Sequence, residues 1–253
     1  MHLAARAPRP PTNWRRGMES PGRRTEERMA LIIEEHQFNG LETLLRETEA
    51  LLRAEFAKQR PEPHAVMLSG GSTPLPVYEA IAANPSAAAD TLHITFSDDR
   101  HVPYDSPMSN YGNTLPMLAA LGVGTDRQII VNPELSLAAS AKDFGARLEQ
   151  FLEGGGKLSL AVLGIGDDTH TCSLFSQANL DAAEGHWAIP VERDTPPHRV
   201  SVTPSVLERA ERIIFLAAGE KKRPVIQQLL NDPMTTIAGR AVHRCGQVEL
   251  WYA

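Results

Sequence analysis

Cysteine and long apolar runs are both scarce in this chain of 253 residues. Its two cysteines, Cys172 and Cys245, are too few for a disulfide framework and lack the CxxC spacing of redox motifs, which favours a reducing compartment such as the cytoplasm. The longest apolar runs, at 158–163 and 213–218, fall far below the roughly 20 residues that span a bilayer. We therefore expect a cytoplasmic protein that does not insert into a membrane.

Basic residues are scarce outside the N-terminal segment. The formal net charge is −6, but residues 1–28 hold seven of the 25 basic and three of the 31 acidic side chains, so the remainder carries about −10. Such an acidic chain is a poor match for nucleic acid, and we expect no nucleic-acid partner. An anionic ligand would have to be bound in a local pocket.

Residues 1–28 form a segment rich in proline, arginine and glycine without periodic apolar positions. This composition is typical of a disordered tail. A start site assigned too early is the alternative, because Met18 and Met29 both precede the first expected element. The prolines at 8, 10 and 11 disfavour an amphipathic targeting helix. We expect one folded domain over residues 29–253.

Helical and strand patterns alternate along the rest of the chain. Apolar positions three and four residues apart predict helices, and short apolar runs predict strands. The expected helices lie near 41–56, from 74 onward, and near 109–121, 137–152, 204–210 and 221–230; the expected strands lie at 65–68, 91–96, 129–131, 158–163, 200–202, 213–218 and 248–252. This alternation predicts an α/β fold with a single doubly wound, mostly parallel sheet and helices on both faces. In such a sheet, ligands bind where the carboxyl ends of the strands meet the loops.

Two of the loops that follow expected strands have the side chains of an anion site. The segment 69–73 is Ser-Gly-Gly-Ser-Thr, in which the glycines permit a tight turn and the hydroxyls and free amides can donate to an anion. The segment 97–103 contains two carboxylates, an arginine and a histidine, which can bind an anion or move protons. An ordinary strand–helix turn and a solvated polar loop are the respective structural alternatives.

Two later loops add a histidine and a lysine. The segment 164–172 begins Gly-Ile-Gly and brings His170 to the end of a strand, where an imidazole can take a proton from water and return it to a leaving oxygen. Lys222 follows the strand at 213–218, and Arg199 precedes the strand at 200–202. A lone histidine is more often structural and lysines at a helix start are usually solvated, so each signal is weak when taken alone.

Taken together and in this order, these segments resemble the 6-phosphogluconolactonase family, part of a larger group that includes glucosamine-6-phosphate deaminase. The family's SGGSTP is intact at 69–74 and its SNYG at 109–112, while FVDERxVP matches 96–103 with two substitutions. LGxGPDGHTASLFP matches 163–176, and GExK matches 219–222. The resemblance covers about residues 30–252.

Four residues of the histidine loop depart from the family's pattern. Asp167 and Ser176 replace prolines, and Cys172 replaces an alanine. Thr169 replaces a glycine directly before His170. A glycine can adopt a positive φ at little cost, whereas a β-branched residue is strained there. We therefore expect consequences for loop geometry, and through it for rate or substrate preference.

The resemblance implies hydrolysis of 6-phospho-D-glucono-1,5-lactone to 6-phospho-D-gluconate, a step of the pentose phosphate pathway, with no metal and no other cofactor. It implies that His170 is the catalytic base, that Asp98 orients His170 or the water, and that Arg100 either stabilises the oxyanion or binds the phosphate. The residues that it implies for substrate binding are Ser69, Gly70, Gly71, Ser72, Thr73, Asp168, Arg199 and Lys222. A monomer and a weak dimer both remain open.

Two other functions remain open as well. The first is an aldose–ketose isomerase or deaminase of the same larger group, although such a protein should have an acidic base in the loop of Arg100 and a GHIA-like histidine loop, whereas Thr171 follows His170 here. The second is a sugar-phosphate sensor that has kept the fold and lost catalysis through Thr169. Turnover of the lactone, compared with binding of 6-phosphogluconate, separates these alternatives.

Overall fold

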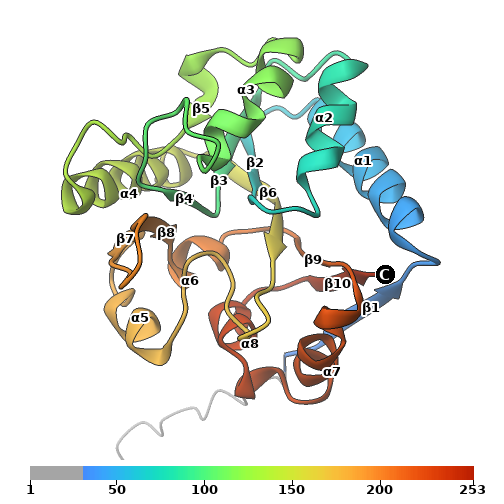
Figure 1. Ribbon diagram of the computed structural model, residues 1–253. Coiled ribbons are helices and arrows are strands. Elements are labelled where there is room, and N and C mark those ends of the chain that lie inside the picture. Colours follow the sequence, from blue (N-terminus) through green and yellow to red (C-terminus); the bar gives the residue numbers. More distant parts are fainter. Residues whose placement is uncertain (1–30) are drawn as a thin grey trace, which may run out of the picture. The chain divides into compact units, whose positions relative to one another are not determined.

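The computed structural model describes residues 31–253, so the expectations for residues 1–28 lie outside the described part of the chain. A seven-stranded sheet lies at its centre (Figure 1), with the order β1-β10-β9-β6-β2-β3-β5 and every neighbouring pair parallel. The strands are β1 (Ile33–Gln37), β2 (His64–Leu68), β3 (Leu92–Phe96), β5 (Gln128–Ile129), β6 (Lys157–Gly164), β9 (Ile213–Ala217) and β10 (Val248–Tyr252). The predicted doubly wound, mostly parallel sheet is confirmed; the sequence pattern missed β1.

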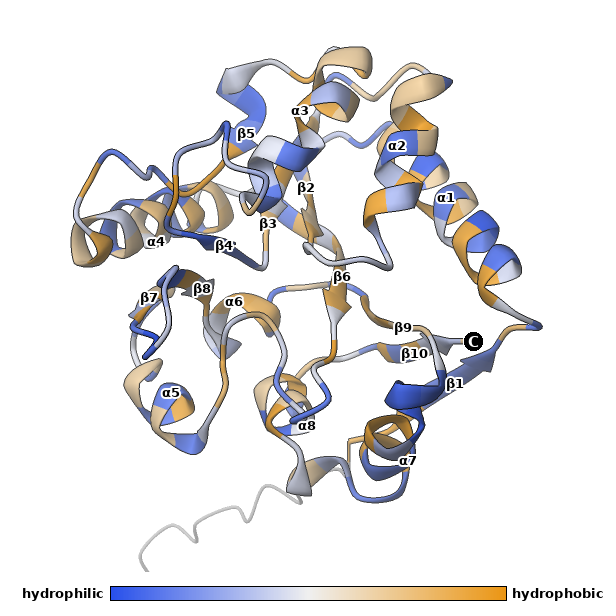
Figure 2. Ribbon diagram, viewed as in Figure 1, coloured by the Kyte–Doolittle hydropathy of each residue, from blue (hydrophilic) through white to orange (hydrophobic). Residues whose placement is uncertain are grey.

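Alternate residues of the central strands point into two separate apolar cores. In β2, Ala65 and Met67 belong to one core and Val66 and Leu68 to the other, as the two-residue repeat of a strand requires. Helices α1–α3 complete the second core, and α4 and α6–α8 complete the first. The helices are α1 (Leu41–Ala57), α2 (Leu75–Ala83), α3 (Asn110–Ala120), α4 (Leu137–Glu153), α5 (Gln177–Ala182), α6 (Pro204–Leu207), α7 (Arg223–Asn231) and α8 (Ile237–Val242). Figure 2 shows mixed hydrophobic and hydrophilic faces on α1 and α7, as expected for helices that cover a sheet.

The direction of winding reverses between β2 and β6. From β2 the chain continues to β3 and β5 on one side, and from β6 it continues to β9 and β10 on the other. A crevice forms outside the carboxyl ends of the strands at such a switch point. The segments 69–73 and 164–172 follow β2 and β6, so the topology brings the glycine-rich loop and the histidine loop together.

A small antiparallel sheet accompanies the main one and was not predicted. Its order is β4-β8-β7, formed by β4 (Asp98–Arg100), β7 (Ala188–Val191) and β8 (Arg199–Val202). The strand expected at 200–202 therefore belongs to this sheet and not to the parallel one. Ser97 connects β3 to β4: its N–H donates to Leu68 O (2.8 Å), and its carbonyl accepts from Val202 N (3.0 Å). These two bonds hold the small sheet at the carboxyl end of β2.

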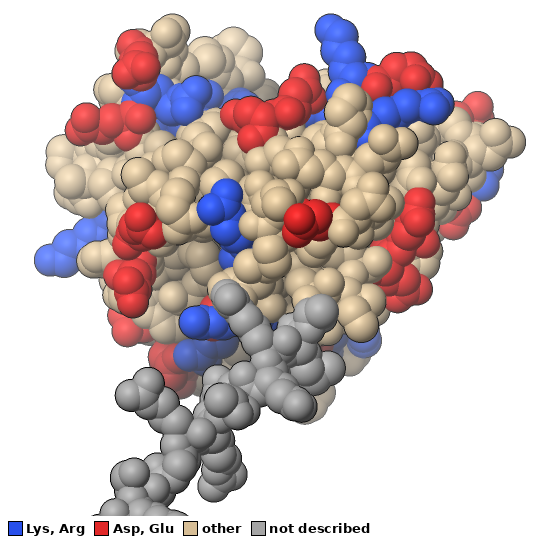
Figure 3. All heavy atoms as spheres, turned by 90° about the horizontal axis from the view of Figure 1, so that it is seen from below, with Lys and Arg blue, Asp and Glu red and all other residues tan. Residues whose placement is uncertain are grey.

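Charged side chains of both signs are interspersed on the face drawn in Figure 3. On that face, an anion would meet no broad basic surface. None of the helices within residues 31–253 has both the length and the apolar character needed to span a bilayer.

Candidate active site

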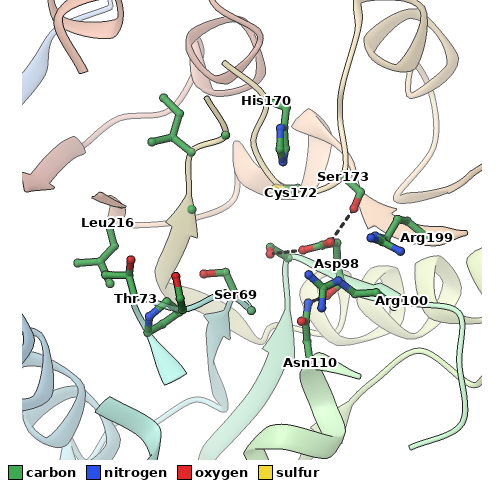
Figure 4. Close-up of a pocket in the computed structure, with 18 of the residues that line it drawn as sticks. Ser69, Thr73, Asp98, Arg100, Asn110, His170, Cys172, Ser173, Arg199 and Leu216 are labelled. Atoms are coloured by element: carbon green, nitrogen blue, oxygen red, sulfur yellow. Dashed lines mark hydrogen bonds between the residues drawn. The ribbon is translucent and has the colours of Figure 1, made fainter. Parts of the chain in front are cut away.

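A cavity of about 360 Å³ opens at the carboxyl ends of β2 and β6 (Figure 4). Of the eleven residues predicted for the site, ten line this cavity: Ser69, Gly70, Gly71, Ser72, Thr73, Asp98, Arg100, His170, Arg199 and Lys222. The eleventh, Asp168, contacts the cavity residue His170. Five separate segments of the chain thus converge on one volume.

The loop after β2 needs a glycine at position 70. A Cβ atom there would lie 1.8 Å from Asn110 Oδ1, and Asn110 in turn donates through Nδ2 to Asp98 O (2.9 Å). The backbone of the loop therefore packs directly against the first turn of α3. The Ser69 hydroxyl lines the cavity, is buried, and has no hydrogen-bond partner among the described residues. A buried hydroxyl without a partner is costly, which indicates a donor kept for a ligand.

Asp98 is held by two serine hydroxyls at the base of the cavity. Ser97 Oγ donates to Oδ1 (2.9 Å), and Ser173 Oγ donates to Oδ2 (2.6 Å, Figure 4). The residue is only 8% exposed. From the sequence, Asp98 was expected to orient His170 or the water; in the structure, each of its oxygens accepts a hydrogen bond from a serine.

His170 is oriented by Asp168, which the sequence analysis assigned to substrate binding. Its Nδ1 is hydrogen-bonded to Asp168 Oδ1, and its ring lies 4.5 Å from the ring of Phe175. Burial raises the pKa of Asp168, but the hydrogen bond and the charge of His170 outweigh burial and lower this pKa overall. An ionised Asp168 favours the tautomer with hydrogen on Nδ1, which leaves the Nε2 lone pair free to accept a proton.

The residue before His170 has a positive φ, as expected for a position where the family has glycine. Thr169 has φ 71°, a strained backbone conformation for a β-branched residue. The residue also accepts two hydrogen bonds from backbone amides at the start of α8. Ile237 N donates to Thr169 Oγ1 (3.2 Å), and Ala238 N donates to Thr169 O (2.9 Å). The next amide of α8, that of Gly239, donates to Thr236 Oγ1 (2.8 Å). Thr169 therefore satisfies two of the helix's free N–H groups, which otherwise lack partners at a helix start.

Two arginines lie next to each other on neighbouring strands of the small sheet. Arg100 and Arg199 are cross-strand partners in β4 and β8, and both line the cavity. Burial, followed by the charge of Arg100, lowers the pKa of Arg199. The Arg100 Nε is buried without a partner among the described residues, although Nη1 donates to Met108 O (2.8 Å). Like charges that face each other across strands are destabilising, so this pair favours an anion beside it.

Lys222 lines the cavity from the turn between β9 and α7. Its Nζ donates to Ile165 O (2.6 Å) and is paired with Asp167 Oδ1 (2.7 Å). Lys222 is therefore held in place at the cavity, which agrees with a binding role. Its ion pair with Asp167 was not expected.

Sequence reasoning missed Arg193 and the role of Asp99. Arg193 lines the cavity, with its guanidinium 3.8 Å from the Phe175 ring centroid; it follows β7, a strand that was not predicted. Asp99 turns away from the cavity and caps α3, accepting from Asn110 N (2.7 Å), Tyr111 N (3.1 Å) and the backbone N–H of Arg100 (2.7 Å). Within residues 31–253, no group of three or more His, Cys, Asp or Glu side chains is arranged to hold a metal ion.

Comparison with known proteins identifies the family of this chain. The model of the family of glucosamine-6-phosphate isomerases and 6-phosphogluconolactonases matches residues 41–251. The human 6-phosphogluconolactonase is 36% identical over 179 residues, which cover 66% of this chain and 69% of the human one.

Two solved structures share the fold. The 6-phosphogluconolactonase from Shewanella baltica superposes with a TM-score of 0.74 at 23% identity, covering 87% of this chain and 98% of that chain. A monomeric glucosamine-6-phosphate deaminase superposes with a TM-score of 0.66 at 18% identity, covering 87% and 97%. The match of the family model and the identity to the human protein show that this chain belongs to the family of glucosamine-6-phosphate isomerases and 6-phosphogluconolactonases.

Proposed function

We propose that this protein is a 6-phosphogluconolactonase, which hydrolyses 6-phospho-D-glucono-1,5-lactone to 6-phospho-D-gluconate in the pentose phosphate pathway. One observation supports it above the others: an imidazole oriented by a carboxylate lines the same cavity as an opposed pair of arginines. The first feature is suited to activating water, and the second is suited to an anionic substrate. A cytoplasmic location is part of the proposal and is supported by the two free cysteines.

The chemistry follows from the free Nε2 of His170. This nitrogen takes a proton from a water molecule as the water oxygen bonds to the lactone carbonyl carbon. Asp168 stabilises the imidazolium that forms, because its carboxylate already accepts the hydrogen bond from Nδ1. The imidazolium then returns the proton to the ring oxygen as the carbonyl carbon–ring oxygen bond breaks, and the new carboxylic acid loses its proton to solvent.

Arg100 supplies positive charge for the tetrahedral intermediate. The Arg100 side chain lines the cavity, and a donor aimed at developing charge is worth roughly 3 kcal/mol in the transition state. Asp98 accepts the hydrogen bond from Ser173, and its negative charge acts on Arg199. With both oxygens engaged, Asp98 is a positioning group in this mechanism and His170 is the base.

The phosphate group is assigned to the remaining donors of the cavity. Lys222, Arg199 and the hydroxyl and amide donors of residues 69–73 all line it. The backbone N–H groups of residues 70–73 have no hydrogen-bond partner among the described residues, so they add to the donors of the side chains. Asp168 remains a positioning residue for His170 in this proposal.

Freshly generated 6-phosphogluconolactone provides the test. Hydrolysis releases a proton, so a pH indicator in weak buffer follows the rate, from which the spontaneous rate is subtracted. We expect acceleration proportional to protein concentration. A protein that binds 6-phosphogluconate without accelerating hydrolysis would be a sensor, and one that releases ammonia from glucosamine 6-phosphate would be a deaminase; either result contradicts the proposal.

A further inference from the structure

The ammonium of Lys222 already has an anionic partner within this chain. A lysine has three N–H donors, and two of them are used by Ile165 O and Asp167 Oδ1. The Lys222 side chain is 26% exposed and lines the cavity, whereas the Asp167 side chain is 64% exposed. One donor and a partly compensated charge are left for a ligand.

The fold does not depend on this ion pair. The Lys222 backbone N–H donates to Gly219 O (2.9 Å), and its ammonium is held by the carbonyl of Ile165. Exposed ion pairs of this kind contribute little to stability. A proline, which the family's pattern has at position 167, would supply no carboxylate at all. The effect of Asp167 is therefore to be sought in ligand binding.

We propose that Asp167 is a specificity-determining residue that weakens binding of the substrate's phosphate group by competing with it for Lys222. This inference rests on the proposed function, in which Lys222 binds the phosphate. A phosphate dianion and the carboxylate would bind the same ammonium and repel each other across it. The hydrogen bond and charge of Lys222 lower the pKa of Asp167, so the carboxylate is ionised at neutral pH. The expected consequences are a higher KM for phosphorylated lactone and faster release of phosphorylated product.

Calorimetric titration of the full chain with inorganic phosphate and with 6-phosphogluconate tests this competition. Asp167→Asn should lower the Kd for both by at least about threefold at low salt, with a smaller effect at high salt because the repulsion is screened. In turnover assays, kcat/KM for the phosphorylated lactone should rise relative to that for gluconolactone. Glu220→Gln is the matched control: it removes one negative charge from the turn that contains Lys222, but Glu220 is paired with Arg223 (2.6 Å).

A double-mutant cycle with Lys222→Gln separates direct competition from a general charge effect. Lys222→Gln alone should weaken phosphate binding, and adding Asp167→Asn to it should have a clearly smaller effect than Asp167→Asn has in the wild-type protein. Unchanged or weaker binding by Asp167→Asn would overturn the inference and show that Asp167 positions the lysine or has no effect. Equal tightening by Glu220→Gln, or tightening by Asp167→Asn that is undiminished without Lys222, would overturn it as well.

The binding measurements do not require turnover. A wild-type protein that binds phosphate without hydrolysing the lactone contradicts the proposed function alone, and the Asp167 variants still decide the inference. A protein that binds neither phosphate nor 6-phosphogluconate, with or without Asp167, contradicts both.

Discussion

Thr169 offers a quantitative test of how the histidine loop is stabilised. Its φ of 71° costs a β-branched residue about 1–2 kcal/mol relative to glycine. Against this, its hydroxyl accepts from the part-buried Ile237 N, and leaving that amide without an acceptor costs about 1–3 kcal/mol. The two contributions are similar in size and opposite in sign, so substitutions that remove them separately should differ in stability.

Three substitutions separate the strain from the hydrogen bond. Thr169→Val keeps the strain and removes the hydroxyl, so we expect a loss of about 1–3 kcal/mol. Thr169→Gly removes both the strain and the bond, and the added flexibility of glycine costs about 0.5–1 kcal/mol, so its stability should lie about 1 kcal/mol below that of wild type and above that of the valine variant. Thr169→Ser keeps the hydroxyl without the branch and should be the most stable variant.

Urea and thermal unfolding measure these differences. For a chain of this size, 1 kcal/mol corresponds to a shift of about 2–4 °C in Tm, so valine and glycine should be clearly resolved. The turnover of each variant at a temperature well below its Tm then reports whether the bond to α8 also positions His170. Both variants lack the Ile237 bond, so a glycine variant no more stable than the valine variant would refute the strain contribution. A valine variant as stable as wild type would refute the contribution of the bond.

Three further predictions concern individual site residues. His170→Asn should lower the hydrolysis rate by about 10²–10⁴ while 6-phosphogluconate binding, measured by calorimetry, is retained; near-full activity would remove His170 from the mechanism. Arg199→Gln should raise KM for the phosphorylated lactone by tenfold or about 1.4 kcal/mol, with a smaller effect on gluconolactone; equal effects on both would argue against phosphate binding. Asp99→Ala should lower the free energy of unfolding at pH 7 by at least about 2 kcal/mol, because three backbone amides lose their acceptor; an unchanged urea midpoint would contradict this capping role.

The main sheet and the location of the site could be predicted because both depend on local patterns. Buried parallel strands appear as short apolar runs, as in β6, and the loops after such strands must meet at one edge. Placing His170 and the 69–73 loop in one cavity therefore required no knowledge of tertiary packing. The positive φ at Thr169 was expected for a different reason, because the resembled family has a glycine at this position.

The small antiparallel sheet could not be predicted because its strands are defined by long-range partners. The strand β4 is Asp-Asp-Arg, which has the composition of a solvated loop, and it becomes a strand only through pairing with β8 about a hundred residues later. The charge of Asp99 is accommodated by the start of α3, although burial raises the pKa of this carboxyl to about 6. Because β7 was also missed, nothing in the sequence pattern pointed to Arg193.

Sequence spacing also did not show which carboxylate is hydrogen-bonded to the imidazole. Asp98 was expected to orient His170 or the water and Asp168 to bind substrate, whereas Asp168 is the carboxylate bonded to His170. Two serines at positions 97 and 173 accommodate Asp98, and the second of these is 75 residues away in the chain. Only the distances between side chains reveal that Asp168 is the partner of His170.

The substitutions on either side of Asp168 show how departures from a family's pattern can be accommodated. Each has gained a partner from a distant segment: Asp167 binds Lys222, and Thr169 binds the amide of Ile237. A substitution that strains the loop is tolerated when a new hydrogen bond or ion pair of the side chain offsets the cost of the strain. Lys222 and Ile237 lie 55 and 68 residues further along the chain than Asp167 and Thr169. Comparison of the loop motif alone therefore overestimates how much the two substitutions disturb the loop. The loss of catalysis through Thr169, considered from the sequence as the route to a sensor, therefore has no support in the geometry around His170.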